Sequence, residues 1–223
     1  MANKADYTQN IAAEIAIIIL AAGASHRFGS DKLLTPVAGK RLIDWSVEAA
    51  VASNVGPILV VTNPNRKLKL DHHPLEANVS LIINSAWHEG LSSSILCGLQ
   101  VLSATNIRAA IFTLSDQPLL TPEVYQRIAN KFQQQSSPLI AASYDGEPRN
   151  PVLIHRELWE TASRIQGDIG LAALTRSGTA ELVECGDIAS IADIDSPADL
   201  LAVEAVLLQD RHDKKYFQAK NNC

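Results

Sequence analysis

The chain has 223 residues, of which 47% are hydrophobic and 19% are charged. This length and this balance exclude a disordered chain and favour a globular domain with an amply buried core. The formal net charge of −5 excludes a broad nucleic-acid-binding surface, because such a surface needs a surplus of Lys and Arg. We therefore expect no nucleic-acid partner, although local cations can still bind a small anion.

Buried strands alternate with amphipathic helices along the chain. Short apolar runs predict strands over residues 15–21, 57–61, 79–83, 109–114 and 139–142. Between these runs, apolar residues recur at helical spacing, and the residues that define these faces are Ile43, Val47, Ala50, Val51, Ile95, Leu99, Leu102, Val124, Ile128 and Phe132. The alternation predicts a three-layer α/β domain with a mostly parallel sheet.

Two helix starts are marked by their sequence. The stretch "TPEV" places Thr121 at an N-cap and Pro122 in the first turn. The stretch "SPAD" places Ser196 at an N-cap and Pro197 in the first turn, and Asp199 is the expected partner of Ser196 in a capping box.

Three segments fall outside the alternating pattern. Residues 1–14 are a polar N-terminal extension, and residues 63–76 read as a long polar surface excursion. Residues 210–223 lose the helical periodicity and read as a frayed helix or a tail. Without an internal repeat or a flexible linker, the remaining residues 15–209 are expected to form one domain.

The cysteines and the N-terminus favour a soluble cytoplasmic protein. Cys97, Cys185 and Cys223 are widely separated and show no metal-ligand spacing, so reduced thiols are the simplest interpretation. Residues 1–14 lack the apolar centre of a signal peptide, and no apolar run approaches the roughly 18 residues of a membrane span. We expect no membrane partner.

The first strand leads into a loop that begins with small residues and continues with cations, in "IAIIILAAGASHRFGSDKLL" (15–34). The spacing of Gly23 and Gly29 fits neither a P-loop nor the dinucleotide fingerprint. One interpretation is that backbone N–H groups hold part of a nucleotide while Arg27 and Lys32 reach its phosphates. The alternative is a solvated surface loop. Ligands in such sheets bind beyond the carboxyl ends of strands, which is where this loop lies.

Acidic residues occupy two further positions of this kind. Asp116 follows the strand predicted over 109–114, where a carboxylate suits Mg²⁺ beside a triphosphate; alternatively it opens a turn before Pro118. Asp193 and Asp195 project to the same side if their segment is extended, which suits a shared metal position. Alternatively, Asp195 merely precedes a helix cap.

The stretch "EGLSSSI" places three hydroxyl groups at the start of a helix. One of Ser92, Ser93 and Ser94 can cap that helix. The histidines show no metal-ligand spacing, and no nucleophile and base are placed together on strand ends, so a covalent mechanism is not supported.

Four stretches in order resemble one family. "LAAGASHRFGSDKLL" resembles the signature loop of nucleotidyltransferases, and more narrowly that of the molybdenum cofactor cytidylyltransferases. "WHEGLSSSILCGL", "LSDQPLLTPE" and "ADIDSPADL" resemble later motifs of the same group. Together they cover about residues 17–201. The resemblance implies a Rossmann-like fold of the nucleotide-diphospho-sugar transferase type and makes residues 15–209 a nucleotidyltransferase domain.

The resemblance also implies a function. CMP would be transferred from CTP to the molybdopterin form of the molybdenum cofactor, with Mg²⁺ as cofactor, in-line attack and release of pyrophosphate. A molybdenum hydroxylase or its maturation factor is the implied protein partner. Two alternatives stay open: a cytidylyl or guanylyl transferase that acts on a sugar or polyol phosphate, and a non-catalytic module that binds nucleotide and delivers cofactor.

Residue by residue, the resemblance assigns Arg27, Lys32 and Asp116 to catalysis. It assigns metal binding to Asp116 together with Asp193 or Asp195. The residues that it places against the nucleotide are Leu20, Ala21, Ala22, Gly23, Ser25, Gly90, Ser92, Ser93 and Ser94.

The chain departs from the family pattern at two places. Arg149 stands where the family has Gly, and Ala172 or Ala173 stands where it has Arg. These departures leave the identity of the acceptor open. The loop itself reads Leu-Ala-Ala-Gly, as in cytidylyl enzymes, whereas guanylyl relatives tend to have Gly at the position of Ala22.

Overall fold

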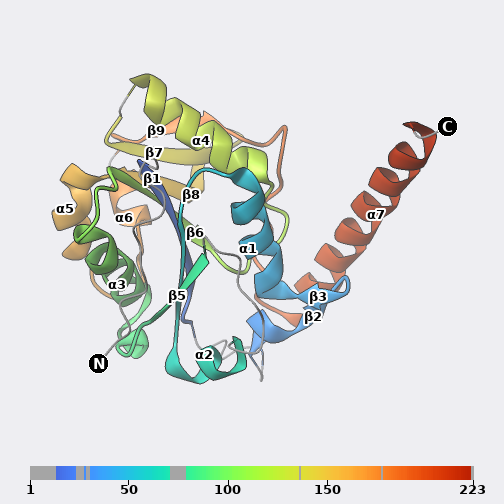
Figure 1. Cartoon of the computed structure of the whole chain (residues 1–223), viewed down its shortest axis with the longest axis horizontal. Coiled ribbons are helices and arrows are strands. Elements are labelled where there is room, and N and C mark those ends of the chain that lie inside the picture. Colours follow the sequence, from blue (N-terminus) through green and yellow to red (C-terminus); the bar gives the residue numbers. More distant parts are fainter. Residues whose placement is uncertain are drawn as a thin grey trace.

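The computed structural model describes residues 14–23, 28, 31–70, 79–135, 137–176 and 178–221. These residues form a seven-stranded sheet in the order β5-β4-β1-β6-β8-β7-β9, and the helices lie on its two faces (Figure 1). The strands are β1 (Ile15–Ala21), β4 (Ile58–Thr62), β5 (Val79–Ile83), β6 (Ala109–Leu114), β7 (Leu139–Tyr144), β8 (Glu147–His155) and β9 (Glu181–Glu184). Within this seven-stranded sheet, β8 alone runs antiparallel to its neighbours, so the predicted mostly parallel α/β sheet is confirmed.

The central strand β1 supplies both faces of the core. All seven of its residues are buried, and they alternate between two clusters because successive side chains of a strand point to opposite faces. Ile17 and Ile19 pack with α1 (Leu42–Ser53) and α4 (Pro122–Gln135), whereas Ile18 and Leu20 pack with α3 (Leu91–Ser103) and α5 (Trp159–Ser163). This double coverage explains the unbroken apolar run in the sequence.

The remaining elements are short, apart from the last helix. They are the hairpin β2 (Pro36–Val37) and β3 (Lys40–Arg41), the helices α2 (Pro64–Leu70) and α6 (Ala172–Thr175), and 3-10 turns at Lys32–Leu34, Trp87–Glu89 and Arg156–Leu158. The helix α7 (Pro197–Asn221) leaves the body of the molecule (Figure 1). It continues through residues 210–221, which had been predicted as a frayed helix or tail. None of the helices in the described ranges is both long enough and apolar enough to cross a membrane.

The two predicted helix starts differ in their hydrogen bonds. At α7, the Asp199 carboxylate accepts the backbone N–H of Ser196, and the Ser196 hydroxyl accepts the N–H of Asp199, so the capping box is confirmed. Helix α4 begins at Pro122 as predicted. Thr121 therefore holds the predicted N-cap position. However, its buried hydroxyl has no hydrogen-bond partner among the described residues, so it supplies no side-chain cap.

The predicted surface excursion over 63–76 is wrong at its start. Asn63, which directly precedes α2, and Arg66, within α2, are both buried and donate hydrogen bonds to carbonyls of Ala22 and Gly23 after β1. Residues 71–78 lie outside the described residues.

The strand order places a crevice beside β1. From β1 the chain moves outward through β4 to β5 and then returns to β6 on the other side of β1. Such a reversal opens a crevice beyond the carboxyl ends of the two central strands. The loops after β1 and β6, which carry Lys32 and Asp116, meet there.

Candidate active site

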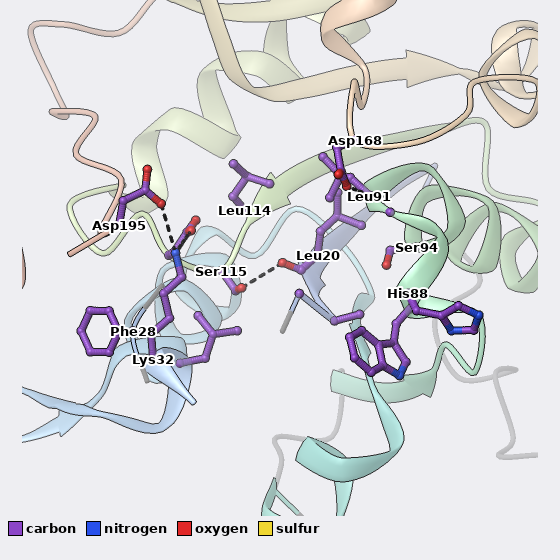
Figure 2. Close-up of a pocket in the computed structure, with 16 residues that line it drawn as sticks. Leu20, Phe28, Lys32, His88, Leu91, Ser94, Leu114, Ser115, Asp168 and Asp195 are labelled. Atoms are coloured by element: carbon purple, nitrogen blue, oxygen red, sulfur yellow. Dashed lines mark hydrogen bonds and ion pairs between the residues drawn. The ribbon is translucent and has the colours of Figure 1, made fainter. Parts of the chain in front are cut away.

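A cavity of about 510 Å³ lies at the carboxyl ends of β1 and β6 (Figure 2). This volume is within the range of small-molecule sites. The residues that line it come from the loops after β1 and β6, the start of α3, the turn after α5 and the segment before α7. They are Leu20, Ala22, Gly23, Phe28, Lys32, Leu33, Trp87, His88, Gly90, Leu91, Ser94, Leu114, Ser115, Asp116, Asp168 and Asp195.

At one end of the cavity, a lysine lies between two carboxylates. The Nζ of Lys32 donates a hydrogen bond to Oδ2 of Asp116 at 2.7 Å and another to the carbonyl of Ile194 at 2.6 Å. The same Nζ lies 3.6 Å from Oδ1 of Asp195, and Figure 2 shows the lysine pointing toward that carboxylate. Three segments far apart in the sequence thus bring one positive and two negative charges together at the switch point, the place beside β1 where the strand order reverses.

Asp193 has a different hydrogen-bond partner from Asp116. The amide Nε2 of Gln117 donates to Oδ1 of Asp193 at 2.8 Å, and Asp193 does not line the cavity. Partial burial raises the pKa of Asp193, and the negative charges of Asp116 and Asp195 raise that pKa further. The two aspartates therefore differ in placement, with Asp195 beside Lys32 and Asp193 beside Gln117.

At the other end of the cavity lies the start of α3. The helix begins after Gly90, without a side-chain cap. Instead, the carboxylate of Asp168 accepts the backbone N–H of Leu91 at 3.1 Å, and the carbonyl of Gly167 accepts that of Ser92 at 3.0 Å. The interpretation in which a serine caps α3 is therefore wrong.

The three serines at this start point to different surroundings. Ser94 lines the cavity, whereas Ser92 and Ser93 face a neighbouring groove. The amide Nδ2 of Asn84 donates to the hydroxyl oxygens of Ser93 at 2.8 Å and Ser94 at 3.0 Å. Asn84 therefore fixes the hydroxyl that faces the cavity.

We expect Gly90→Ala to destabilise the protein by about 2–5 kcal/mol. The φ of Gly90 is +100°, which an L residue rarely adopts, and an added Cβ would lie 2.7 Å from the carbonyl carbon of Gly167. Gly146→Ala is the matched control, because Gly146 has a φ of +79° but open space around its Cβ position. The control should lose only about 1–2 kcal/mol. Urea unfolding measures both, and equal losses would contradict a close contact at Gly90.

The other predicted residues divide into three groups. Leu20, Ala22 and Gly23 line the cavity. Ala21 is buried in the core below the cavity, and its carbonyl accepts from Arg66. Ser25 and Arg27 lie outside the described residues.

Several lining residues escaped the sequence analysis. Phe28, Trp87 and His88 lie inside motifs that the resemblance covers. Their position in these motifs could have identified them as residues of the site. Asp168 lies in "GDIGLAA", the segment in which the resemblance points only to a missing arginine. Neither Arg149 nor the pair Ala172 and Ala173 belongs to the described lining of the cavity.

The acidic pair is chemically suited to a divalent cation. Mg²⁺ takes one or two carboxylates and completes its shell with phosphate oxygens and water. Asp116 and Asp195 both place an oxygen within 3.6 Å of the Lys32 ammonium, so this position already holds positive charge. The described residues contain no group of three or more His, Cys, Asp or Glu side chains that could hold a metal alone. Water or phosphate oxygens would complete the shell.

The fold and the family comparison identify the class of protein as nucleotidyltransferase. The family model of the MobA-like NTP transferase domain matches residues 17–183, which is well over half of the chain. The chain belongs to this family.

Two curated relatives and one solved structure show how far the similarity extends. The molybdenum cofactor cytidylyltransferase of Escherichia coli K12 is 24% identical over 187 residues, which cover 84% of this chain and 94% of that protein. The purine catabolism protein PucB of Bacillus subtilis 168 is 23% identical over 191 residues, which cover 82% and 92%. The crystal structure of Rv0371c from Mycobacterium tuberculosis H37Rv matches with a TM-score of 0.71 at 20% identity, covering 86% and 98%. This structural match confirms the Rossmann-like fold.

Proposed function

We propose that the protein transfers CMP from CTP to the molybdopterin form of the molybdenum cofactor and releases pyrophosphate. The observation that carries the proposal is the group of Lys32, Asp116 and Asp195 at the switch-point cavity. The name of the Escherichia coli relative supports the choice of nucleotide and acceptor.

In this proposal the nucleotide occupies the cavity from end to end. The apolar side chains of Leu20, Trp87 and Leu91 form a wall for the base, and the hydroxyl of Ser94 and the carboxylate of Asp168 offer polar contacts nearby. The phosphates lie toward Lys32. Backbone N–H groups at Ala22 and Gly23 lie between these two ends, and glycine lets a ligand approach the backbone closely.

The reaction would be an in-line attack of the acceptor phosphate on the α-phosphorus of CTP. The attacking oxygen is already anionic, so no general base is needed, and catalysis rests on positioning and charge stabilisation. Asp116 and Asp195 would hold Mg²⁺, which neutralises phosphate charge when it is bound. Lys32 would stabilise the charge that develops on the transferred phosphoryl group, together with Arg27. Asp193 is the weaker candidate for a metal ligand, because Gln117 holds it.

The test is pyrophosphate release by the full chain with CTP, Mg²⁺ and molybdopterin, with acceptor omitted as the control. Sugar phosphates, polyol phosphates and GTP replace the proposed substrates in parallel assays. If pyrophosphate is released only with another acceptor, that acceptor replaces molybdopterin in the proposal. Binding of nucleotide without release in any assay would favour the non-catalytic delivery module.

The base preference depends on Ala22. Its methyl group lies on backbone that lines the cavity, and this added bulk suits a single-ring pyrimidine better than a purine. We expect CTP to be preferred over GTP, and we expect Ala22→Gly to narrow the preference without inverting it. A methylene-sized change is worth about 10- to 200-fold in selectivity. The measurement is the ratio of kcat/KM for the two nucleotides. A wild-type preference for GTP would refute the proposal, and an unchanged ratio in the variant would refute the role of Ala22.

A further inference from the structure

A buried arginine lies directly beneath the loop that follows β1. Arg66, in the first turn of α2, is 1% exposed. Its Nε donates to both carboxylate oxygens of Asp31 at 2.8 Å, and its Nη2 donates to the carbonyl of Gly23 at 2.8 Å. Its Nη1 donates to the carbonyl of Ala21. The guanidinium fork therefore contacts both ends of the loop between residues 23 and 31.

The side chain of Asn63, which directly precedes α2, completes this arrangement. The Nδ2 of Asn63 donates to the carbonyl of Ala22 at 3.0 Å, and its Oδ1 accepts the backbone N–H of Arg66 at 2.8 Å. The carbonyls of Ala21, Ala22 and Gly23 are thus all directed to Asn63 and Arg66. Three consecutive carbonyls directed to one place are unlike an extended strand, in which successive carbonyls alternate in direction.

This orientation determines where the N–H groups of the loop point. In a trans peptide the N–H is antiparallel to the carbonyl of the preceding residue. Carbonyls of Ala21 and Ala22 that point to α2 therefore direct the N–H groups of Ala22 and Gly23 away from it. Both residues line the cavity, whereas Arg66 does not belong to its lining. Successive N–H groups directed into one concavity are a common anion-binding arrangement.

The same arginine also controls the position of the lysine in the site. Asp31, which Arg66 holds, directly precedes Lys32, and the backbone carbonyl of Asp31 accepts the N–H of Leu34 to begin the 3-10 turn. A shift of Asp31 would therefore move Lys32 relative to Asp116.

We propose that Arg66 is a positioning residue. It turns the backbone after β1 toward the bound nucleotide and holds Lys32 in register with the two carboxylates. This inference rests on the proposed function, since it assigns the nucleotide to that backbone. Arg66 does not line the cavity and would touch no substrate.

A buried ion pair is weak evidence of stabilisation, because its desolvation can cost as much as the pair gains. The test variant therefore removes both charges, as Arg66→Met with Asp31→Asn, so that no uncompensated carboxylate remains. Ile128→Val, a small deletion at a buried position of α4 outside the lining of the cavity, serves as the matched control for a loss of stability. Arg66→Lys keeps the charge but not the fork that reaches two carbonyls and Asp31.

Three measurements on the full chain test the proposal: the Kd of CTP with Mg²⁺, the melting temperature, and amide hydrogen exchange of peptides that cover residues 21–34 and 109–114. In the double variant we expect CTP to bind roughly 100-fold more weakly, because small misplacements of a preorganised site are costly. Exchange should rise in residues 21–34 only. Arg66→Lys should weaken CTP binding nearly as much, and Ile128→Val should leave it within about twofold of wild type.

Unchanged CTP binding in the double variant would overturn the proposal, as would full rescue by lysine or a rise in exchange that spreads equally to residues 109–114. If wild type binds no nucleotide, the proposed function fails. In that case the exchange contrast between the two peptides still decides whether Arg66 holds the loop.

Discussion

Asp116→Asn is expected to lower the kcat of Mg²⁺-dependent pyrophosphate release steeply while the fold stays intact. Asp116 follows β6 at the edge of the cavity, where its carboxylate accepts a hydrogen bond from Lys32. The amide keeps the size of the side chain but removes the negative charge that a divalent cation needs. Loss of one preorganised charge contact in a site of this kind costs roughly 10²–10³-fold in kcat. The measurement is pyrophosphate release at saturating Mg²⁺, with the melting temperature as the check on folding.

Asp193→Asn is the matched variant for this prediction. It removes the same charge from a residue that Gln117 holds away from the cavity, and its effect should be much smaller than that of Asp116→Asn. Asp195→Asn should resemble Asp116→Asn instead. Near wild-type turnover of Asp116→Asn would refute the metal assignment, and a loss in Asp193→Asn that exceeds the loss in Asp195→Asn would reverse the choice between the two aspartates.

Most of the strands that could be predicted are buried on both faces. The runs that became β1, β4, β6 and β7 are continuous and apolar because helices cover the central sheet on both sides. The run that became β5 is also largely apolar, although only Val79 of its five residues is buried. Strand β8 contains Pro148 and Pro151, which usually argue against a strand. In β9, one residue of four is buried, so its sequence has little apolar signal. These two strands could not be identified from local pattern alone.

In the candidate site, too, residues with a clear local sequence signal could be predicted, whereas residues whose role depends on distant parts of the chain could not. Lys32, Asp116 and Asp195 could be proposed because each follows a strand or precedes a helix at one edge of a parallel sheet. Arg66 could not, since its polar neighbours suggest a surface segment. Its burial depends on carbonyl groups of residues 21 and 23, which lie more than forty positions earlier in the chain. Asp168 is a similar case, because its contact with the start of α3 spans 77 positions.

Lys32→Met is expected to have two opposite effects, one on catalysis and one on metal binding. In the proposed reaction the ammonium stabilises charge on the transferred phosphoryl group, and its removal should lower kcat by about 10²–10³-fold at saturating CTP. A fall in affinity for CTP without a fall in kcat would mean that Lys32 binds only the ground-state phosphates.

The second effect follows from the contacts of Lys32 without substrate. Its ammonium lies 2.7 Å from Asp116 and 3.6 Å from Asp195, so it competes with a divalent cation for the same oxygens. Removing this positive charge should strengthen the binding of Mn²⁺ alone by at least about tenfold, or about 1.4 kcal/mol. Lys131→Met is the control, because Lys131 makes a comparable ion pair with Glu181 at 2.6 Å outside the cavity lining. Electron paramagnetic resonance of free Mn²⁺ measures both variants. Weaker Mn²⁺ binding in Lys32→Met would show that the lysine supports the metal site. An equal increase in Mn²⁺ affinity in both variants would show that the change in net charge, and not the position of Lys32, causes the effect.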